Sequence, residues 1–93
     1  TLHQLAVKRV NNNTQAALLM KLEPQLTEEE RTIARRGRNA KGIVPKNADV
    51  QTYRKSTGLE ALVGYLYLKK DAERLQWVLQ QIEEVVGHAN HQL

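Results

Sequence analysis

The segment from Gln51 to Lys70 places the strongest constraint on the fold. Its apolar side chains recur three and four positions apart, which is the spacing that aligns them along one face of an α-helix. They are Leu59, Leu62, Val63, Leu66 and Tyr67, with Ala61, Tyr65 and Leu68 widening the face. A helix that is apolar nearly all round is buried on most of its sides. The segment is therefore predicted to be a central helix that other elements surround.

The remaining periodic segments are also helical, and no strand pattern is convincing, so the predicted fold class is all-α. Helices are predicted from Thr1 to Val10, from Thr14 to Leu22, from Thr27 to just before Gly37, and from Asp71 to Gly87, with a frayed end at 88–93. Thr27 and Glu30 have the spacing of a capping box. The acids at 28–30 are therefore interpreted as capping residues. The asparagines at 11–13 are interpreted as a helix junction, although such a run can also signal RNA contacts.

Size and composition limit the possible classes of protein. The 93 residues predict a single domain over residues 1–93, and the absence of Phe leaves a modest core that favours a homodimer. The absence of Cys excludes disulfides and cysteine nucleophiles. No apolar run approaches the roughly 20 residues that span a bilayer, so we expect no membrane partner and an intracellular, soluble protein. The first residue is not Met, so the chain is expected to be the trimmed end of a longer protein.

Basic residues are concentrated in one part of the chain. Eight of the 14 Lys and Arg residues lie between positions 31 and 55, where Asp49 is the only acid. Such clustering is expected of a nucleic-acid surface, but a solvated face, an acidic protein partner or an anionic membrane also fits it. The stretch from Asn39 to Val50 contains Gly42 and Pro45 and is predicted to be an exposed loop. The candidate RNA-binding residues are Arg35, Arg36, Arg38, Asn39, Lys41, Lys46, Tyr53 and Arg54.

Glu60 is the only charged residue in the apolar stretch from Ser56 to Leu68. None of the residues three or four positions from it is basic, so an ion pair along the helix is excluded. A carboxylate on a nearly buried helix needs compensation from a cation, a metal or a donor elsewhere. An arginine on another helix and a bound metal ion both satisfy this requirement. One carboxylate alone does not make a Mg²⁺ site for phosphodiester cleavage, because the ion needs further oxygen ligands.

Four sequence blocks resemble a known family. They are L-T-E-E-E at 26–30, R-G-R-N-A-K at 36–41, P-K-N-A-D-V-Q-T-Y-R at 45–54 and S-T-G-L-E-A-L-V-G-Y-L at 56–66. Together they closely resemble Mini-ribonuclease III, and the likeness extends to about Ile82. The second and third blocks are long and specific.

The resemblance implies a helical bundle of the ribonuclease III endonuclease domain type, assembled as a homodimer without a separate RNA-binding domain. It implies Mg²⁺-dependent endonucleolytic cleavage of double-stranded RNA in the maturation of 23S ribosomal RNA precursor, in the bacterial cytoplasm or plastid stroma. Glu60 is then the catalytic, metal-ligating glutamate of the second catalytic motif. Thr57 stands where longer ribonuclease III enzymes have an aspartate, which fits the Mini branch. The loop from Arg38 to Asp49 is implied to face the RNA.

One expected motif is missing from the sequence. The family's Gly-Asp-Ala segment, with its essential aspartate, would lie upstream of Thr1. We therefore expect a domain that is incomplete at its N-terminus and that hydrolyses weakly or not at all by itself. Two alternatives remain open: a catalytically inactive RNA-binding or dimerisation module on the same fold, and a helical interaction domain whose basic patch binds an acidic protein.

Overall fold

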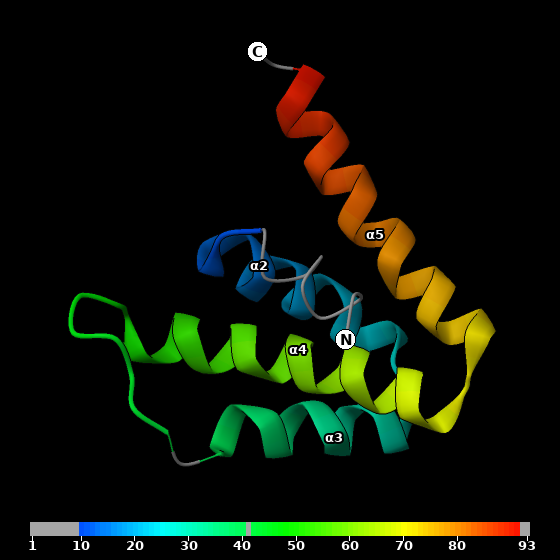
Figure 1. Ribbon diagram of the computed structural model, residues 1–93, viewed down its shortest axis with the longest axis horizontal. Coiled ribbons are helices and arrows are strands. Elements are labelled where there is room, and N and C mark those ends of the chain that lie inside the picture. Colours follow the sequence, from blue (N-terminus) through cyan, green and yellow to red (C-terminus); the bar gives the residue numbers. More distant parts are fainter. Residues whose placement is uncertain (1–9, 41, 92–93) are drawn as a thin grey trace.

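The computed structural model describes residues 10–40 and 42–91, and its helices are arranged around α4 (Figure 1). The elements are α2 (Asn12–Leu22), the 3-10 turn η1 (Glu23–Gln25), α3 (Glu28–Asn39), α4 (Val50–Lys69) and α5 (Ala72–His91). Helix α4 contacts α2, α3 and α5. In Figure 1, α2 and α3 flank α4, and α5 rises from the end of α4. Every regular element in the described residues is helical, so the all-α prediction is confirmed.

The hydrophobic core is centred on α4. Leu59, Leu62 and Val63 have no exposed surface, which confirms the predicted central helix. The other core members are Leu18, Leu19, Leu22, Leu26, Ala34, Leu66, Leu75, Val78 and Ile82. Burial was wrongly predicted for Tyr67 and Leu68, which are 42% and 78% exposed. These two side chains lie on the part of α4 that the neighbouring helices leave uncovered.

Helix α2 begins two residues earlier than predicted. Asn11 is its N-cap, because the Asn11 Oδ1 accepts a hydrogen bond of 2.8 Å from the backbone N–H of Thr14. Within the asparagine run, Asn11 thus caps α2 and Asn12 and Asn13 form its first residues. On this helix Met20 is 56% exposed, whereas Gln15 is buried. The Gln15 amide can occupy this buried position because it donates to the Val10 carbonyl at 2.7 Å.

Helix α3 begins as predicted but ends later. The capping box is confirmed: Thr27 Oγ1 accepts from the Glu30 N–H at 3.1 Å, and Glu30 accepts from the Thr27 N–H at 2.8 Å. The predicted end before Gly37 is wrong, because the helix continues to Asn39. Gly37 lies where α3 crosses α4, and a Cβ atom there would lie 2.6 Å from the Ala61 Cβ. The glycine permits close helix packing and does not end the helix.

An ion pair joins the starts of α3 and α5. Arg74 Nη2 lies 2.7 Å from Glu30 Oε1, and Arg74 Nε donates to Glu30 Oε2 at 2.9 Å. Arg74 Nη2 also donates to the Gln25 carbonyl at 3.2 Å, and the guanidinium stacks 4.3 Å from the Trp77 ring centroid. The Arg74 hydrogen bonds, supported by those from Thr27, lower the pKa of Glu30 although burial opposes the shift. Glu30 therefore has a tertiary role beyond the predicted cap.

The C-terminal helix is longer than predicted. Helix α5 runs to His91, so the predicted end at Gly87 is wrong. A glycine inside a long helix costs only about 1 kcal/mol, which does not stop it. Of the predicted helix at 1–10, only Val10 lies within the described residues. Residues 92–93 also lie outside them. Within the described ranges, no helix is both long and apolar enough to cross a membrane.

Candidate nucleic-acid interface

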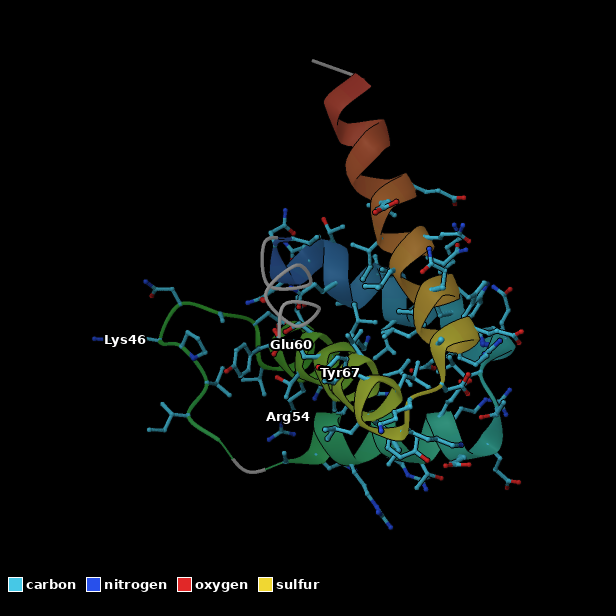
Figure 2. All side chains as sticks on the ribbon, turned by 45° about the vertical axis from the view of Figure 1, so that its right-hand side comes forward. Lys46, Arg54, Glu60 and Tyr67 are labelled. Atoms are coloured by element: carbon cyan, nitrogen blue, oxygen red, sulfur yellow. The ribbon has the colours of Figure 1, made fainter. Side chains whose placement is uncertain are left out.

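Glu60 lies in the middle of α4, and its side chain is half-buried. Its sequence neighbours are held firmly, because Leu59 is fully buried in the core and Ala61 packs against Gly37 of α3. Figure 2 shows Glu60 on α4, with Arg54 on a different side of the same helix, toward α3. The backbone position of Glu60 is therefore fixed by the core and by the α3–α4 crossing.

The structure brings four of the predicted RNA-binding residues together. Arg38, Asn39, Tyr53 and Arg54 line a cavity of about 370 Å³ between the end of α3, the following loop and the start of α4. The other lining residues are Gly37, Ala40, Gly42, Val44 and Thr57. We call this the arginine cavity. It combines two guanidinium groups with an aromatic ring and an amide, which is a set of side chains suited to phosphate and nucleotide contacts.

The other predicted basic residues do not line this cavity. Arg35 and Arg36 are exposed on α3. Arg35 lines a smaller cavity of about 180 Å³, to which Arg38 also contributes. Lys46 is exposed in the loop and points away from the helices (Figure 2). Lys41 lies outside the described residues.

Arg38 is partly engaged within the chain. Its Nη1 lies 3.1 Å from Oε1 of Glu23, and the two side chains are 35% and 38% exposed. Ion pairs with this much exposure contribute only about 0–1 kcal/mol, because water screens them. An incoming phosphate can therefore replace Glu23 at little cost.

Two glycines set the spacing between the basic end of α3 and α4. A Cβ atom at Gly58 would lie 2.8 Å from both the Ala34 carbonyl oxygen and the Arg38 Cγ. Gly37 makes the matching approach from α3, with the Gly58 Cα 3.0 Å from its would-be Cβ. The two helices can pack this closely only because neither position carries a side chain. This contact brings Arg38 and Arg54 to one cavity.

A second cavity lies on the other side of Tyr53. It also measures about 370 Å³ and joins the start of α2 to the loop before α4. Its lining consists of Asn11, Asn12, Asn13, Asn47, Ala48, Asp49, Thr52 and Tyr53. We call this the amide cavity. The asparagine run indicated a possible RNA contact at residues 11–13, but no sequence spacing connects these residues with Asn47.

Asp49 has a structural role at the edge of the amide cavity. Its Oδ2 accepts from the Thr52 backbone N–H and from Thr52 Oγ1, both at 2.9 Å, and so caps α4. These hydrogen bonds lower the pKa of Asp49. The carboxylate is therefore charged near neutral pH and makes the amide cavity unfavourable for anions.

The acidic residues do not form a complete metal site in the described part of the chain. No group of three His, Cys, Asp or Glu residues lies close enough there to hold an ion. Glu60 offers one carboxylate, which fits one oxygen position of Mg²⁺ and leaves the others unfilled. The described residues alone therefore supply fewer ligands than a catalytic Mg²⁺ site needs.

The sequence matches a ribonuclease III family model, and the fold matches a solved structure. The family model described as "Ribonuclease III domain" matches residues 1–71. The crystal structure of a Fusobacterium nucleatum protein superimposes with a TM-score of 0.73, covering 95% of this chain and 84% of that one. Its sequence is 24% identical, so the likeness concerns the fold.

Relatives define the family more narrowly. Mini-ribonuclease 3 of Desulfitobacterium hafniense is 50% identical over 86 residues, which cover 92% of this chain and 55% of the relative. Mini-ribonuclease 3 of Symbiobacterium thermophilum is 54% identical over 86 residues, covering 91% and 66%. That of Enterococcus faecalis is 45% identical over 92 residues, covering 96% and 70%. The chain belongs to the Mini-ribonuclease 3 family of ribonuclease III-domain proteins, as the sequence blocks predicted. It spans between about half and 70% of the length of these curated relatives.

Proposed function

We propose that the whole protein is an endoribonuclease that cleaves double-stranded RNA with Mg²⁺ in the maturation of 23S ribosomal RNA precursor. The proposal includes a homodimer and a location in the bacterial cytoplasm or plastid stroma. Within the whole protein, residues 1–93 are one ribonuclease III-like domain whose first catalytic motif lies on a preceding segment. The observation that carries the proposal is the family membership together with a glutamate on the core helix α4, three residues after Thr57 of the arginine cavity.

The arginine cavity supports binding to a polyanion. Arg54 is exposed and Arg38 has only a screened ion pair, so both guanidinium groups can bind phosphate oxygens. Neither contact reads base identity, and A-form RNA is recognised mainly through its backbone and shape. We therefore propose that these residues position the duplex, with Arg35, Arg36, Lys41 and Lys46 adding sequence-independent attraction.

Glu60 is proposed to be the catalytic residue on this chain. Its carboxylate supplies one ligand for Mg²⁺, and carboxylates from the preceding segment complete the set. Bound Mg²⁺ stabilises negative charge on the phosphate during cleavage. Helix α4 keeps Glu60 in place, because the helix cannot shift without disturbing the buried residues beside Glu60.

The test uses the whole protein with a base-paired fragment of 23S ribosomal RNA precursor. We expect cleavage with Mg²⁺ and none with EDTA. Glu60→Gln should lower the cleavage rate by more than about 100-fold, because loss of a direct ligand should exceed the effect of an outer contact. Duplex binding should be retained. The matched control is Glu84→Gln, because Glu84 is an exposed glutamate on α5.

Three results would contradict parts of the proposal. Full activity of Glu60→Gln would show that Glu60 has no catalytic role. Cleavage that is unchanged in EDTA would show that the reaction does not need the metal. Tight duplex binding without any cleavage would identify an RNA-binding protein built on a nuclease fold.

A further inference from the structure

The amide cavity has a different chemical character from the arginine cavity. Its lining contains four asparagines and a threonine but no lysine or arginine. The side chains of Asn12, Asn13 and Asn47 are exposed and make no hydrogen bond to another described residue. Each carries both a donor and an acceptor. The cavity therefore suits a neutral ligand with hydroxyl groups.

An anion is a poor ligand for this cavity. The starts of α2 and α4 both meet here, but the cap residues already accept the N–H groups of Thr14 and Thr52. Asp49 adds a negative charge whose pKa is lowered by its Thr52 hydrogen bonds. No lysine or arginine lines the cavity to compensate this charge for a bound phosphate, and Lys55, whose charge also lowers the pKa of Asp49, lies outside the lining.

The position of the cavity indicates what it binds. Tyr53 lines both cavities, so a ligand passing from one to the other crosses the Tyr53 ring. A nucleic-acid strand repeats a charged phosphate and a neutral sugar along its length. A cationic site beside a neutral, amide-lined site matches this repeat.

We propose that the amide cavity binds ribose 2′-hydroxyl groups of the same duplex whose phosphates contact Arg38 and Arg54. The inference rests on the proposed function and adds a way to select RNA over DNA. The wide, shallow minor groove of A-form RNA displays its 2′-hydroxyls. Each hydroxyl donates and accepts, as a side-chain amide does. Asn12 and Asn13 approach from α2, and Asn47 approaches from the loop.

The experiment compares two duplexes that differ only at the 2′ position. One is RNA, and the other is 2′-fluoro RNA of the same sequence, which keeps A-form geometry but lacks the hydroxyl donor. Affinities are measured for the whole protein without divalent cations, so that no cleavage occurs. The variant is Asn12→Ala/Asn13→Ala/Asn47→Ala. The matched control is Gln76→Ala/Gln80→Ala, which removes two exposed amides from α5.

We expect the unaltered protein and the control to prefer RNA. The triple variant should lose about tenfold in affinity for RNA, the effect of one to three lost hydrogen bonds. It should bind the fluoro duplex unchanged, so its preference should disappear. Arg54→Ala should weaken both duplexes equally and flatten the salt dependence, because it removes a phosphate contact.

Different results overturn different proposals. A triple variant that retains the preference for RNA overturns the role of the amide cavity. A triple variant that weakens both duplexes equally, with a flatter salt dependence, makes the cavity a phosphate site and also overturns it. Cleavage of duplex RNA in a parallel Mg²⁺ assay would leave the proposed function standing in both cases. A protein that binds neither duplex contradicts the proposed function itself.

Discussion

The ion pair between Glu30 and Arg74 gives a sharp prediction for stability. Arg74→Ala removes both hydrogen bonds to the Glu30 carboxylate and leaves that carboxylate buried, with only 3% of the residue exposed. Breaking a buried pair costs about 3–5 kcal/mol, and an exposed pair contributes about 0–1 kcal/mol. The Arg74 side chain is 30% exposed, so we expect an intermediate loss of about 2–3 kcal/mol in the free energy of unfolding.

Urea denaturation at pH 7, followed by circular dichroism at a fixed protein concentration, measures this loss. The matched control is Lys69→Ala, which breaks a bridge of 3.1 Å to Glu29 with side chains that are 46% and 54% exposed. That bridge also joins α3 to a neighbouring helix, yet its loss should cost at most about 1 kcal/mol. The loss in the free energy of unfolding for Arg74→Lys should lie between those for Arg74→Ala and Lys69→Ala, because lysine keeps the charge but loses the paired hydrogen-bond geometry.

The pH dependence follows from the lowered pKa of Glu30. A carboxylate whose pKa is lower in the folded state stabilises the fold above its unfolded pKa of about 4.3. That stabilisation is lost as the pH falls through the lowered folded value, while Arg74 stays protonated. The difference between the unaltered protein and Arg74→Ala should therefore narrow in acid. Two results would refute this reasoning. One is a difference in the free energy of unfolding between the unaltered protein and Arg74→Ala that is below about 0.5 kcal/mol at pH 7, and the other is a difference that stays constant down to acid pH.

Two further predictions concern the α3–α4 crossing and the cap of α4. Gly37→Ala should lower the free energy of unfolding by about 1–2 kcal/mol, because overpacking against Ala61 outweighs the gain in helix propensity. Gly42→Ala, which meets no atom within 4 Å, is the control and should be neutral in the same denaturation assay. Asp49→Ala should lower the thermal midpoint at pH 7, because Thr52 loses its acceptor. Since the pKa of Asp49 is lowered, this effect should fade as the acid protonates Asp49 in the unaltered protein; a constant difference would contradict the cap.

Local chemistry made the helix starts predictable from sequence. Thr27 and Glu30 are three residues apart, and their reciprocal hydrogen bonds need no other part of the chain. The apolar face of α4 was predictable for the same reason, because helical spacing alone aligns Leu59, Leu62 and Val63. Gly37 shows the limit of local reasoning. A glycine after arginines has the pattern of a helix end, and only the position of α4 shows that it permits a crossing.

Contacts between distant segments could not be predicted from the sequence. Glu30 and Arg74 are 44 residues apart, and nothing in either segment specifies the other. Only part of the arginine cavity was predictable from the sequence. Its residues were identified from charge and family resemblance. The absence of Lys46 from the lining depends on the path of the loop, and that of Arg36 depends on the face of α3 it occupies. The amide cavity depends on α2 and the loop meeting at Tyr53, which requires the packed structure.

Helix α4 carries its cavity-lining residues and its core-forming residues on different parts of its length. Its first two turns line both cavities through Thr52, Tyr53 and Arg54, whereas its middle forms the core. Glu60 lies within that middle, six residues after Arg54, which is about 9 Å along a helix axis. A rigid helix fixes this spacing, and movement of the loop at 42–49 leaves it unchanged. If the proposed function holds, loop substitutions should therefore alter which duplexes bind and how tightly, whereas substitutions that shift α4 should move Glu60 and both cavities together.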